Sequence, residues 1–161
     1  MTATQGAEVA DAGLRKVQAF TDGSCDTGTR RGGWAYLLKY GDKSKQASGF
    51  EADTTNNRME LTAAVRALGA LTQRCAVTIV TDSEYLKKAF TDGWLKRWQA
   101  NGWRTAGRQP VKNQDLWETL LELESRHAVS WSWTKGHAGH EENELVDTLA
   151  LTARRTGVGV G

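Results

Sequence analysis

The segment from Val17 to Cys25, VQAFTDGSC, places an acidic residue, Asp22, at the end of an apolar stretch. The residues before Asp22 have the apolar and aromatic character of a buried strand, and the Gly-Ser pair after it is expected to end that strand. A carboxylate in this position is costly to desolvate unless it has a partner or a cation. Three more acids stand beside other apolar segments of the chain: Glu60, Asp82 and Asp147. We therefore expect four carboxylates from distant parts of the sequence to converge and to bind divalent metal.

The length of 161 residues fits one domain with a sizeable core. No apolar run approaches the ~20 residues that span a bilayer, so no membrane partner is expected. Residues 1–16 lack an apolar core flanked by basic residues, and we expect a flexible leader rather than a secretory signal. Cys25 and Cys75 are the only cysteines, and their spacing fits no metal site, which favours a reducing, cytoplasmic setting.

The order of periodic segments predicts a mixed α/β sheet covered by helices. In chain order, the pattern predicts strands at 17–22, 32–40 and 43–52, a helix at 54–71, a strand at 75–82, a helix at 83–90 capped by Ser83, a helix capped by Asn113 and ending near His127, a strand at 128–134, and a helix at 141–154, before a flexible tail at 156–161. A right-handed crossover would make the fourth strand parallel to another strand. If that neighbour is the first strand, Asp22 and Asp82 emerge together at carboxyl ends, where open α/β sheets build their sites.

Each of the four acids also has a purely structural interpretation. Asp22 in TDGS and Asp82 in TDSE could each cap a turn or helix, but the duplication of this context at two strand ends favours a shared site. Glu60 could close a capping box with Asn57 at the start of its helix. Asp147 lies between apolar residues in mid-helix, where Asp is a poor helix former.

Four carboxylates without cysteine or regular histidine ligands favour a hard, oxygen-seeking cation. Mg²⁺ fits best, with Mn²⁺ as a substitute. Two such ions about 3.5–4 Å apart are suited to phosphodiester cleavage. His137 and His140, in KGHAGH, could instead suggest zinc, but no third ligand is evident. A loop histidine near the acids could also shuttle a proton, and a surface turn remains an alternative for His140.

The formal net charge is only +2, but the segment from Lys87 to Lys112 carries seven Lys or Arg residues against Asp92 alone. A basic segment beside an acidic cluster suits a polyanionic substrate, although a solvated helix face would give the same composition. Trp94 and Trp98, four residues apart, are expected to pack along one helix face, with the cations free to meet phosphates.

With these motifs in view, the chain resembles a bacterial type 1 ribonuclease H. The matching stretches cover about 17–154 and occur in the order FTDGSC, TTNNRMEL, TDSEYL, the Trp-rich segment through PVKNQDLW, KGHAGHEENE and the helix of Asp147. The resemblance implies a catalytic domain at 17–155 with a ribonuclease H-like α/β fold: a five-stranded mixed sheet in the order 3-2-1-4-5, with strands 1–3 antiparallel, flanked by helices. It further implies a monomeric endoribonuclease that hydrolyses the RNA strand of RNA–DNA hybrids and leaves 5′-phosphate and 3′-hydroxyl ends.

The resemblance also assigns roles to matching positions. It implies that Asp22, Glu60, Asp82 and Asp147 bind two Mg²⁺ ions and that His137 is the catalytic loop histidine. The residues implied to contact the substrate are Cys25, Gly28, Thr55, Asn56, Asn57, Glu84, Lys96, Arg97, Trp98, Lys112 and Asn113. Among these, Asn56 and Asn57 would face the minor groove, where RNA displays its 2′-hydroxyls, and Thr55 and Asn113 would hold a DNA-strand phosphate.

Three positions depart from the family pattern. Gly28 stands where many relatives have Asn, Glu84 where Gln is common, and Asp53 where some relatives have a phosphate-contacting Arg. These departures concern the grip on the substrate and leave the four acids intact. Two other functions remain alternatives: a catalytically silent hybrid-binding module, which the retention of all four acids disfavours, and a DNA-cutting or strand-transferring enzyme of the same fold superfamily.

Overall fold

The computed structural model describes residues 13–134 and 141–161, and β1 (Arg15–Cys25) is the centre of its sheet. The five strands lie in the order β3-β2-β1-β4-β5, with β2 at Gly32–Tyr40, β3 at Lys43–Glu51, β4 at Cys75–Thr81 and β5 at Ala128–Trp133. β1, β2 and β3 pair antiparallel, whereas β4 pairs parallel with both β1 and β5. The predicted sheet, including its order and the antiparallel pairing of the first three strands, is confirmed.

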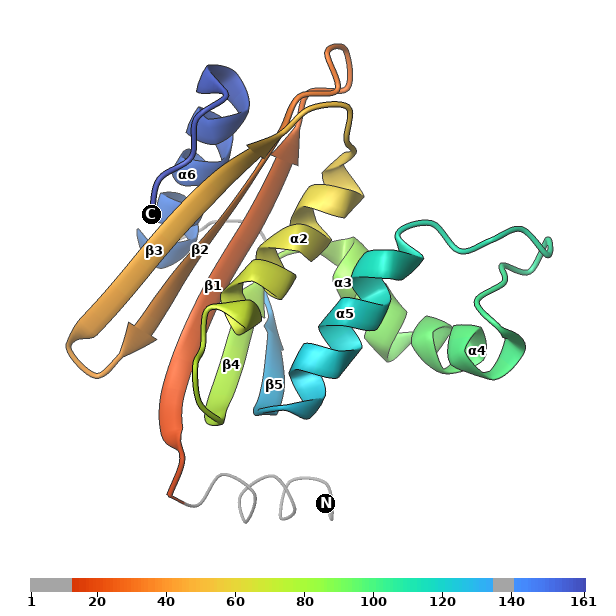
Figure 1. Cartoon of the computed structure of the whole chain (residues 1–161), viewed down its shortest axis with the longest axis horizontal. Helices are drawn as coiled ribbons and strands as arrows, with labels where there is room; N and C mark the ends of the chain where they lie inside the picture. Colours follow the sequence, from red (N-terminus) through yellow and green to blue (C-terminus); the bar gives the residue numbers. More distant parts are fainter. Residues whose placement is uncertain (1–12, 135–140) are drawn as a thin grey trace.

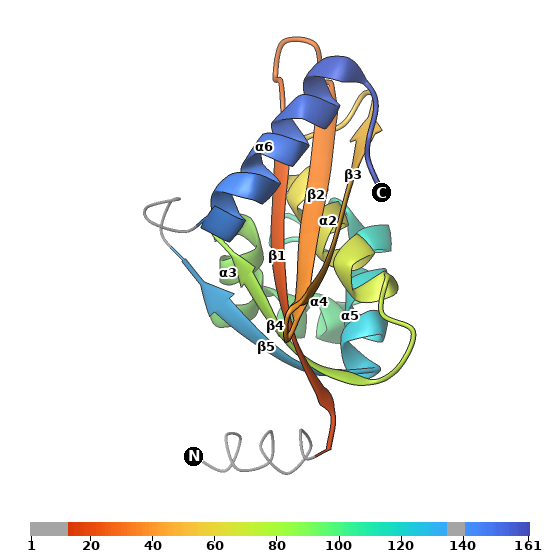
Figure 2. The same ribbon diagram turned by 90° about the vertical axis from the view of Figure 1, so that its left-hand side faces the viewer.

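Helices cover both faces of this sheet, as Figures 1 and 2 show. Their bounds are Asn56–Gly69 for α2, Glu84–Thr91 for α3, Trp94–Asn101 for α4, Gln114–Ser125 for α5 and Glu141–Thr156 for α6. α6 lies on one face, and α2 and α5 lie on the other, while α4 projects away from the sheet (Figure 1). In the part of the chain that the structure describes, no helix is long and apolar enough to cross a membrane.

Two apolar cores hold these layers together. The larger core joins the sheet to α2, α3 and α5, and it contains the fully buried Trp117, whose indole N–H donates to the Tyr85 hydroxyl at 2.9 Å. The smaller core joins the sheet to α6 and includes Phe20, Val146 and Ala150. Because residues of β1 alternate between the two cores, the strand is buried on both faces, which explains its apolar sequence.

The end of β1 differs from the sequence-based prediction. The strand does not stop at Asp22 but continues to Cys25, with Gly23 opposite Trp34 and Ser24 opposite Gly33 in β2. A Cβ at Gly23 would overlap the backbone of α2 at Glu60. This glycine therefore permits the close approach of the helix and does not end the strand.

Both predicted flexible ends are shorter than expected. Arg15 and Lys16, assigned to the leader, already pair with β4. The tail, expected to be flexible, lies against β3: the Ser48 N–H donates to the Val160 carbonyl at 2.9 Å, and the Val160 N–H donates to the Ser48 hydroxyl at 3.1 Å. Unpaired backbone groups of the edge strand provide the partners for this tail.

Helix ends show which capping predictions hold. Ser83 accepts from the Leu86 N–H at 3.1 Å, as expected of an N-cap. Asn113 stands at the N-cap position of α5, but its side chain makes no capping hydrogen bond and its φ is 63°. α4 contains Trp94 and Trp98, expected on one helix face, and it lies between Gly93 and Gly102, both with φ of 76°.

The stability of the sheet depends on the protonation of His127. Its buried imidazole accepts from the Cys75 N–H through Nδ1 at 3.1 Å, and burial, together with the charges of Arg74 and Arg126, lowers its pKa below 6.5. Because the unfolded chain takes up this proton more readily, the free energy of unfolding should fall as the pH drops below the unfolded pKa. We expect His127→Gln, which cannot take up the proton, to reduce the loss of stability between about pH 7.5 and about pH 5.5. Chemical denaturation at both pH values measures this, and an equal loss in the two proteins would contradict it.

Candidate active site

The four acids predicted to converge come from three different layers of the fold. Asp22 lies near the carboxyl end of β1, and Asp82 directly follows the parallel neighbouring strand β4. Glu60 lies in the second turn of α2, on one face of the sheet, and Asp147 in α6, on the other. The acids therefore approach the same strand ends from above and below.

Asp22 is the most perturbed acid in this group. Burial raises the pKa of its carboxyl from 3.8 to about 8. A hydrogen bond with the Asp147 side chain and the negative charges of Asp82 and Asp147 contribute to the increase, whereas the Gly23 N–H, which donates to Oδ1 at 2.9 Å, opposes it. Without a cation, the Asp22 carboxyl therefore retains its proton at neutral pH.

Glu60 adds a second perturbed carboxyl beside Asp82. Burial raises its pKa from 4.5 to about 6, and the charge of Asp82 contributes. The Asn56 amide donates to Oε1 at 2.6 Å, but Oε2 is buried without a hydrogen-bond partner. The structure also excludes the capping-box interpretation of Glu60, because Thr55 is the N-cap of α2 and its hydroxyl accepts from the Arg58 N–H.

The carboxylate oxygens of the four acids are ligands that suit divalent cations. Buried carboxylates with raised pKa values and the unpartnered Glu60 Oε2 are costly unless a positive charge compensates them. Within 13–134 and 141–161, no three acidic, histidine or cysteine side chains are already spaced as ligands of one ion.

The loop after β1 is hydrogen-bonded to the segment that leads into α2. The Cys25 thiol donates to the Thr54 carbonyl at 3.5 Å, and the Thr54 N–H donates to the Arg30 carbonyl at 2.9 Å. The Arg30 guanidinium also pairs with Asp53 at 2.6 Å, so the acid that departs from the family pattern has a cation beside it. Gly28 lies in the same loop, where its N–H donates to Asp26 Oδ1.

The residues expected to contact the nucleic acid gather at the start of α2. Thr55, Asn56 and Asn57 are exposed there, beside the loop that follows β1. Glu84 is exposed at the start of α3, where a negative charge is favourable beside the helix N-terminus.

Sequence reasoning missed Arg58, which connects the two parts of the predicted phosphate site. Its guanidinium donates to Asn113 Oδ1 at 3.3 Å and to both carboxylate oxygens of Asp115, at 3.1 and 2.8 Å. Its backbone N–H donates to the Thr55 hydroxyl at 3.1 Å. The only signal in the sequence is a cation inside the TNNRMEL motif.

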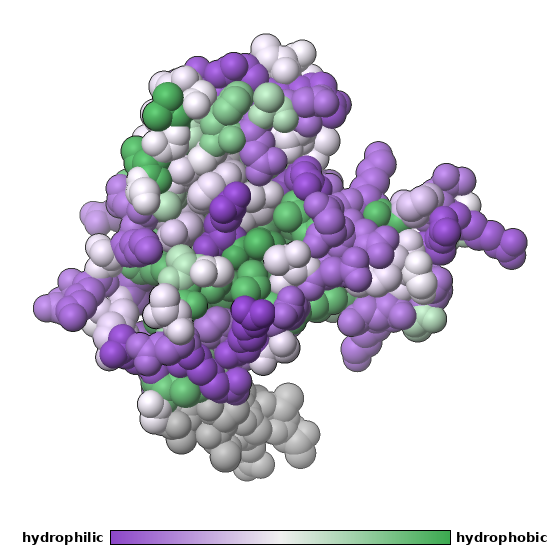
Figure 3. Space-filling model, in the orientation of Figure 1, coloured by the Kyte–Doolittle hydropathy of each residue, from purple (hydrophilic) through white to green (hydrophobic). Residues whose placement is uncertain are grey.

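The basic segment forms the projection beyond α3. Lys96, Arg97 and Lys112 are exposed, and Figure 3 shows hydrophilic surface over α4 and the segment that joins it to α5. Trp98 lies beneath them, with its ring centroid 6.0 Å from that of Trp117 and 5.9 Å from that of Trp94. The tryptophan packing expected along one helix face is therefore present.

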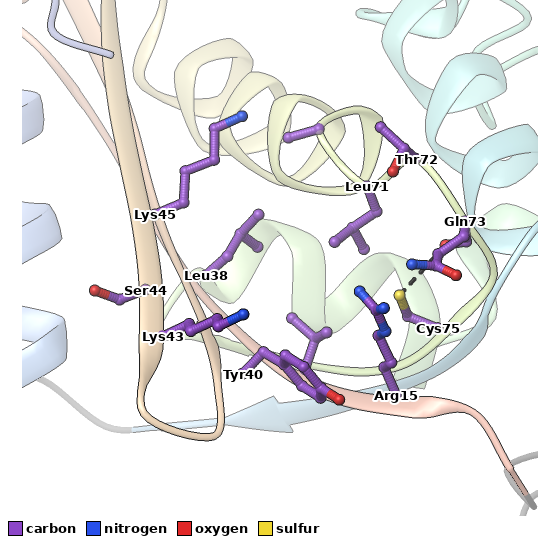
Figure 4. A pocket seen from close by; sticks show the side chains of 12 residues that line it. Arg15, Leu38, Tyr40, Lys43, Ser44, Lys45, Leu71, Thr72, Gln73 and Cys75 are labelled. Atoms are coloured by element: carbon purple, nitrogen blue, oxygen red, sulfur yellow. Dashed lines mark hydrogen bonds between the residues drawn. The ribbon is translucent and has the colours of Figure 1, made fainter.

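A hollow lies at the opposite end of the sheet from the acids (Figure 4). Its volume is about 220 Å³, and Val17, Leu38, Tyr40 and Leu71 line it together with cations. None of the described residues that line this hollow is acidic, so the acids at the carboxyl ends of β1 and β4 remain the candidate active site. His137 and His140 lie outside the described residues.

Comparison with known proteins identifies the family. The RNase H family model matches residues 15–155. The chain belongs to the RNase H family. It is 56% identical over 134 residues to the ribonuclease H of Methylococcus capsulatus, covering 83% of this chain and 86% of that protein. It is 51% identical over 140 residues to the ribonuclease H of Hydrogenovibrio crunogenus, covering 87% and 96%.

A solved structure gives the same result for the fold. The crystal structure of LC9-RNase H1, a type 1 RNase H with the type 2 active-site motif, superposes with a TM-score of 0.78. It is 32% identical and covers 91% of this chain and 75% of that one. The family resemblance, the ribonuclease H-like fold and the enzyme class expected from the sequence are confirmed.

The raised pKa of Asp22 predicts how the metal-free protein responds to pH. Between pH 3.8 and about 8, the folded chain holds a proton that the unfolded chain has released, so this group's contribution to stability falls as the pH rises. In EDTA near pH 8, we expect Asp22→Asn to raise the free energy of unfolding by about 2–4 kcal/mol and to flatten its pH dependence. Urea denaturation at about pH 5 and about pH 8 measures both effects. A variant less stable than the parent at pH 8 would contradict the prediction.

Proposed function

We propose that this RNase H hydrolyses the RNA strand of RNA–DNA hybrids at the Asp22 cluster with two divalent cations, leaving 5′-phosphate and 3′-hydroxyl ends. Asp22, Glu60, Asp82 and Asp147 would hold the cations, with Mg²⁺ as the physiological ion and Mn²⁺ as a substitute. The observation that carries the proposal is the burial of the Asp22 carboxyl beside two other acids, with its pKa raised to about 8. The proposal also expects a monomer in the cytoplasm.

Bound divalent ions would supply Lewis-acid stabilisation of the charge that develops at the phosphate during hydrolysis. The protein residues position the reaction around them. Asp22, whose pKa responds to the charges of Asp82 and Asp147, would help to hold both ions, and Glu60 would contribute from the side of α2. His137, which precedes α6 in the sequence, would assist proton transfer or product release.

A direct hydrogen bond links the acids to the proposed substrate surface. Asn56 donates to Glu60 Oε1, and it also stands beside Asn57 on the exposed start of α2. An amide that faces the minor groove while holding Glu60 would couple recognition of the 2′-hydroxyls to the geometry of the acids. Cys25, Gly28 and the backbone around them would complete this surface, and Glu84 would border it.

A DNA-strand phosphate would be held at Thr55 and Asn113, with Arg58 between them. Arg58 donates to Asn113 and is itself fixed by the bidentate pair with Asp115. The positive φ of Asn113 directs its backbone away from an ordinary helix start. Arg30, held by Asp53, would supply a further cation beside this surface.

The first test concerns the chemistry. We expect Asp22→Asn to reduce cleavage of a labelled hybrid in Mg²⁺ by about 10³-fold or more, because the variant removes a central carboxylate, while hybrid binding stays within a few-fold. Gel assays of cleavage and filter binding of the same hybrid, with and without EDTA, measure the two effects. Undiminished cleavage by the variant would refute the site.

The substrate panel separates the alternatives. The parent protein is assayed on hybrid, RNA duplex and DNA duplex. A protein that binds hybrid without cutting it in either Mg²⁺ or Mn²⁺ would be a silent binding module. Cleavage of DNA duplex as fast as hybrid would make it a DNA-cutting member of the fold superfamily.

The second test concerns the basic projection. Replacing Lys96, Arg97 and Lys112 together by Gln should raise KM about tenfold with little change in kcat, because these exposed cations would bind phosphates rather than the reacting atoms. The slope of log(kcat/KM) against log(salt) should decrease by about 1 for each phosphate that the variant no longer neutralises.

The matched control removes the same number of charges at the other end of the sheet. Lys16, Lys43 and Lys45 are also exposed, but they lie far from the acids. Their replacement by Gln should leave the salt slope near that of the parent. An equal decrease of slope in both triple variants would show that net charge, and not the projection, holds the hybrid.

A further inference from the structure

A small hollow lies directly behind the acids, between α6 and the ends of β1 and β4. Thr21, Asp22, Asp82, Asn143 and Val146 line it. Asn143 is only 6% exposed, and its side-chain Nδ2 is buried without a hydrogen-bond partner. Burying an amide in this state costs free energy, so a retained buried asparagine calls for a partner that it meets in another state of the site.

Water does not provide that partner in the hollow. The space is too narrow to admit a water molecule. The polar side chains that share it with Asn143 are the carboxyl groups of Asp22 and Asp82 and the hydroxyl of Thr21, whose Oγ1 is also buried without a hydrogen-bond partner. A carboxylate is a stronger acceptor than a hydroxyl, because its hydrogen bond is charge-assisted. An amide N–H₂ donates only, and carboxylate oxygens accept, so the chemistry of this pair is complementary.

The geometry of α6 favours Asp82 over Asp22 as the acceptor. Asn143 precedes Asp147 by one helical turn, so both side chains lie on the face directed at the sheet. Asp147 reaches Asp22, to which it is hydrogen-bonded. The helix begins beside the end of β4 and crosses toward β2 (Figure 2). Because Asp147 already occupies the Asp22 carboxyl, Asp82 is the other carboxylate of the hollow to which the Asn143 amide can donate.

We propose that Asn143 is a positioning residue whose side-chain amide donates to the Asp82 carboxylate when divalent cations load the acidic cluster, and so fixes the orientation of that ligand. This inference rests on the proposed function. Bound cations would draw the carboxylates of the cluster toward them, so the oxygens of Asp82 would take up new positions. The buried amide then gains the acceptor that it lacks in the metal-free protein.

Two readouts of Asn143→Leu distinguish this role from a packing role, because they move in opposite directions. In EDTA, the variant removes an unpartnered polar group, so its melting temperature should equal or exceed that of the parent. In titrations with Mn²⁺ and no nucleic acid, its affinity should fall about 10–100-fold, as for other residues that orient a metal ligand. Thermal unfolding and isothermal calorimetry measure the two.

Val146→Ala is the matched control, since Val146 lines the same hollow but carries no donor. Truncation of this buried side chain should lower the melting temperature and leave Mn²⁺ affinity within about twofold. Asn143→Ala is measured in parallel, in case leucine does not fit the hollow, and it should weaken Mn²⁺ binding as leucine does. Parent-like Mn²⁺ affinity in both Asn143 variants, or an equal loss of affinity in Val146→Ala, would overturn the positioning role.

Asp22→Asn in the same calorimetric titration separates this inference from the proposed function. If Asp22→Asn binds Mn²⁺ like the parent, the metal site itself is wrong. If Asp22→Asn loses Mn²⁺ while both Asn143 variants keep it, the metal site stands and only the role of Asn143 fails.

Discussion

The structure depends on the burial of like charges at the carboxyl ends of β1 and β4. Asp22 lies between two apolar cores, and its neighbours Asp82 and Asp147 are also acids, so its carboxyl retains a proton far above its ordinary pKa. Such a cluster destabilises the metal-free fold and has no evident structural benefit. The fold tolerates it because the surrounding sheet and helices are apolar and well packed. A cost of this kind at one end of a stable sheet is typical of a functional site.

The helices on the two faces of the sheet determine from which side each acid reaches the cluster. α6 carries Asp147 to one face of the strand ends, and α2 carries Glu60 to the other. α2 approaches so closely that only glycine fits at position 23. The same helix start displays Asn56 and Asn57 to solvent, so the surface proposed to recognise the hybrid and the acids share one rigid element.

Family membership and the local chemistry support each other but answer different questions. The RNase H family model spans nearly all of the described chain, which establishes the enzyme class. The hydrogen bonds of Arg30 and Arg58 and the unpartnered amide of Asn143 are features of this chain's own geometry, from which its manner of holding substrate and metal ligands is proposed. Asp53 stands where some relatives have a phosphate-contacting Arg, and in this chain Arg30 of a neighbouring loop forms an ion pair with it.

The sequence by itself determined the strands, most of the helices and the four acids. Apolar runs and helical periodicity are local properties, and Ser83 begins α3 as its residue type predicts. Local sequence patterns gave the wrong prediction where contacts with distant residues determined the structure. The Gly-Ser pair after Asp22 continues β1 because β2 pairs with it. Asn113 stands before α5 without capping it, because its side chain is hydrogen-bonded to Arg58 and Tyr85. The tail follows β3 for the same reason, since Ser48 offers it partners.

Only the tertiary structure decided how the acids contact one another, how strongly their pKa values rise, and which donors are left without acceptors. Those properties depend on distances between residues far apart in the chain, such as Asp22 and Asp147, and on how completely packing removes water from them. Asn143 shows this most clearly: its type and position in the sequence are ordinary for an exposed first turn of a helix, and only the structure reveals that it is buried in a hollow shared with Asp82.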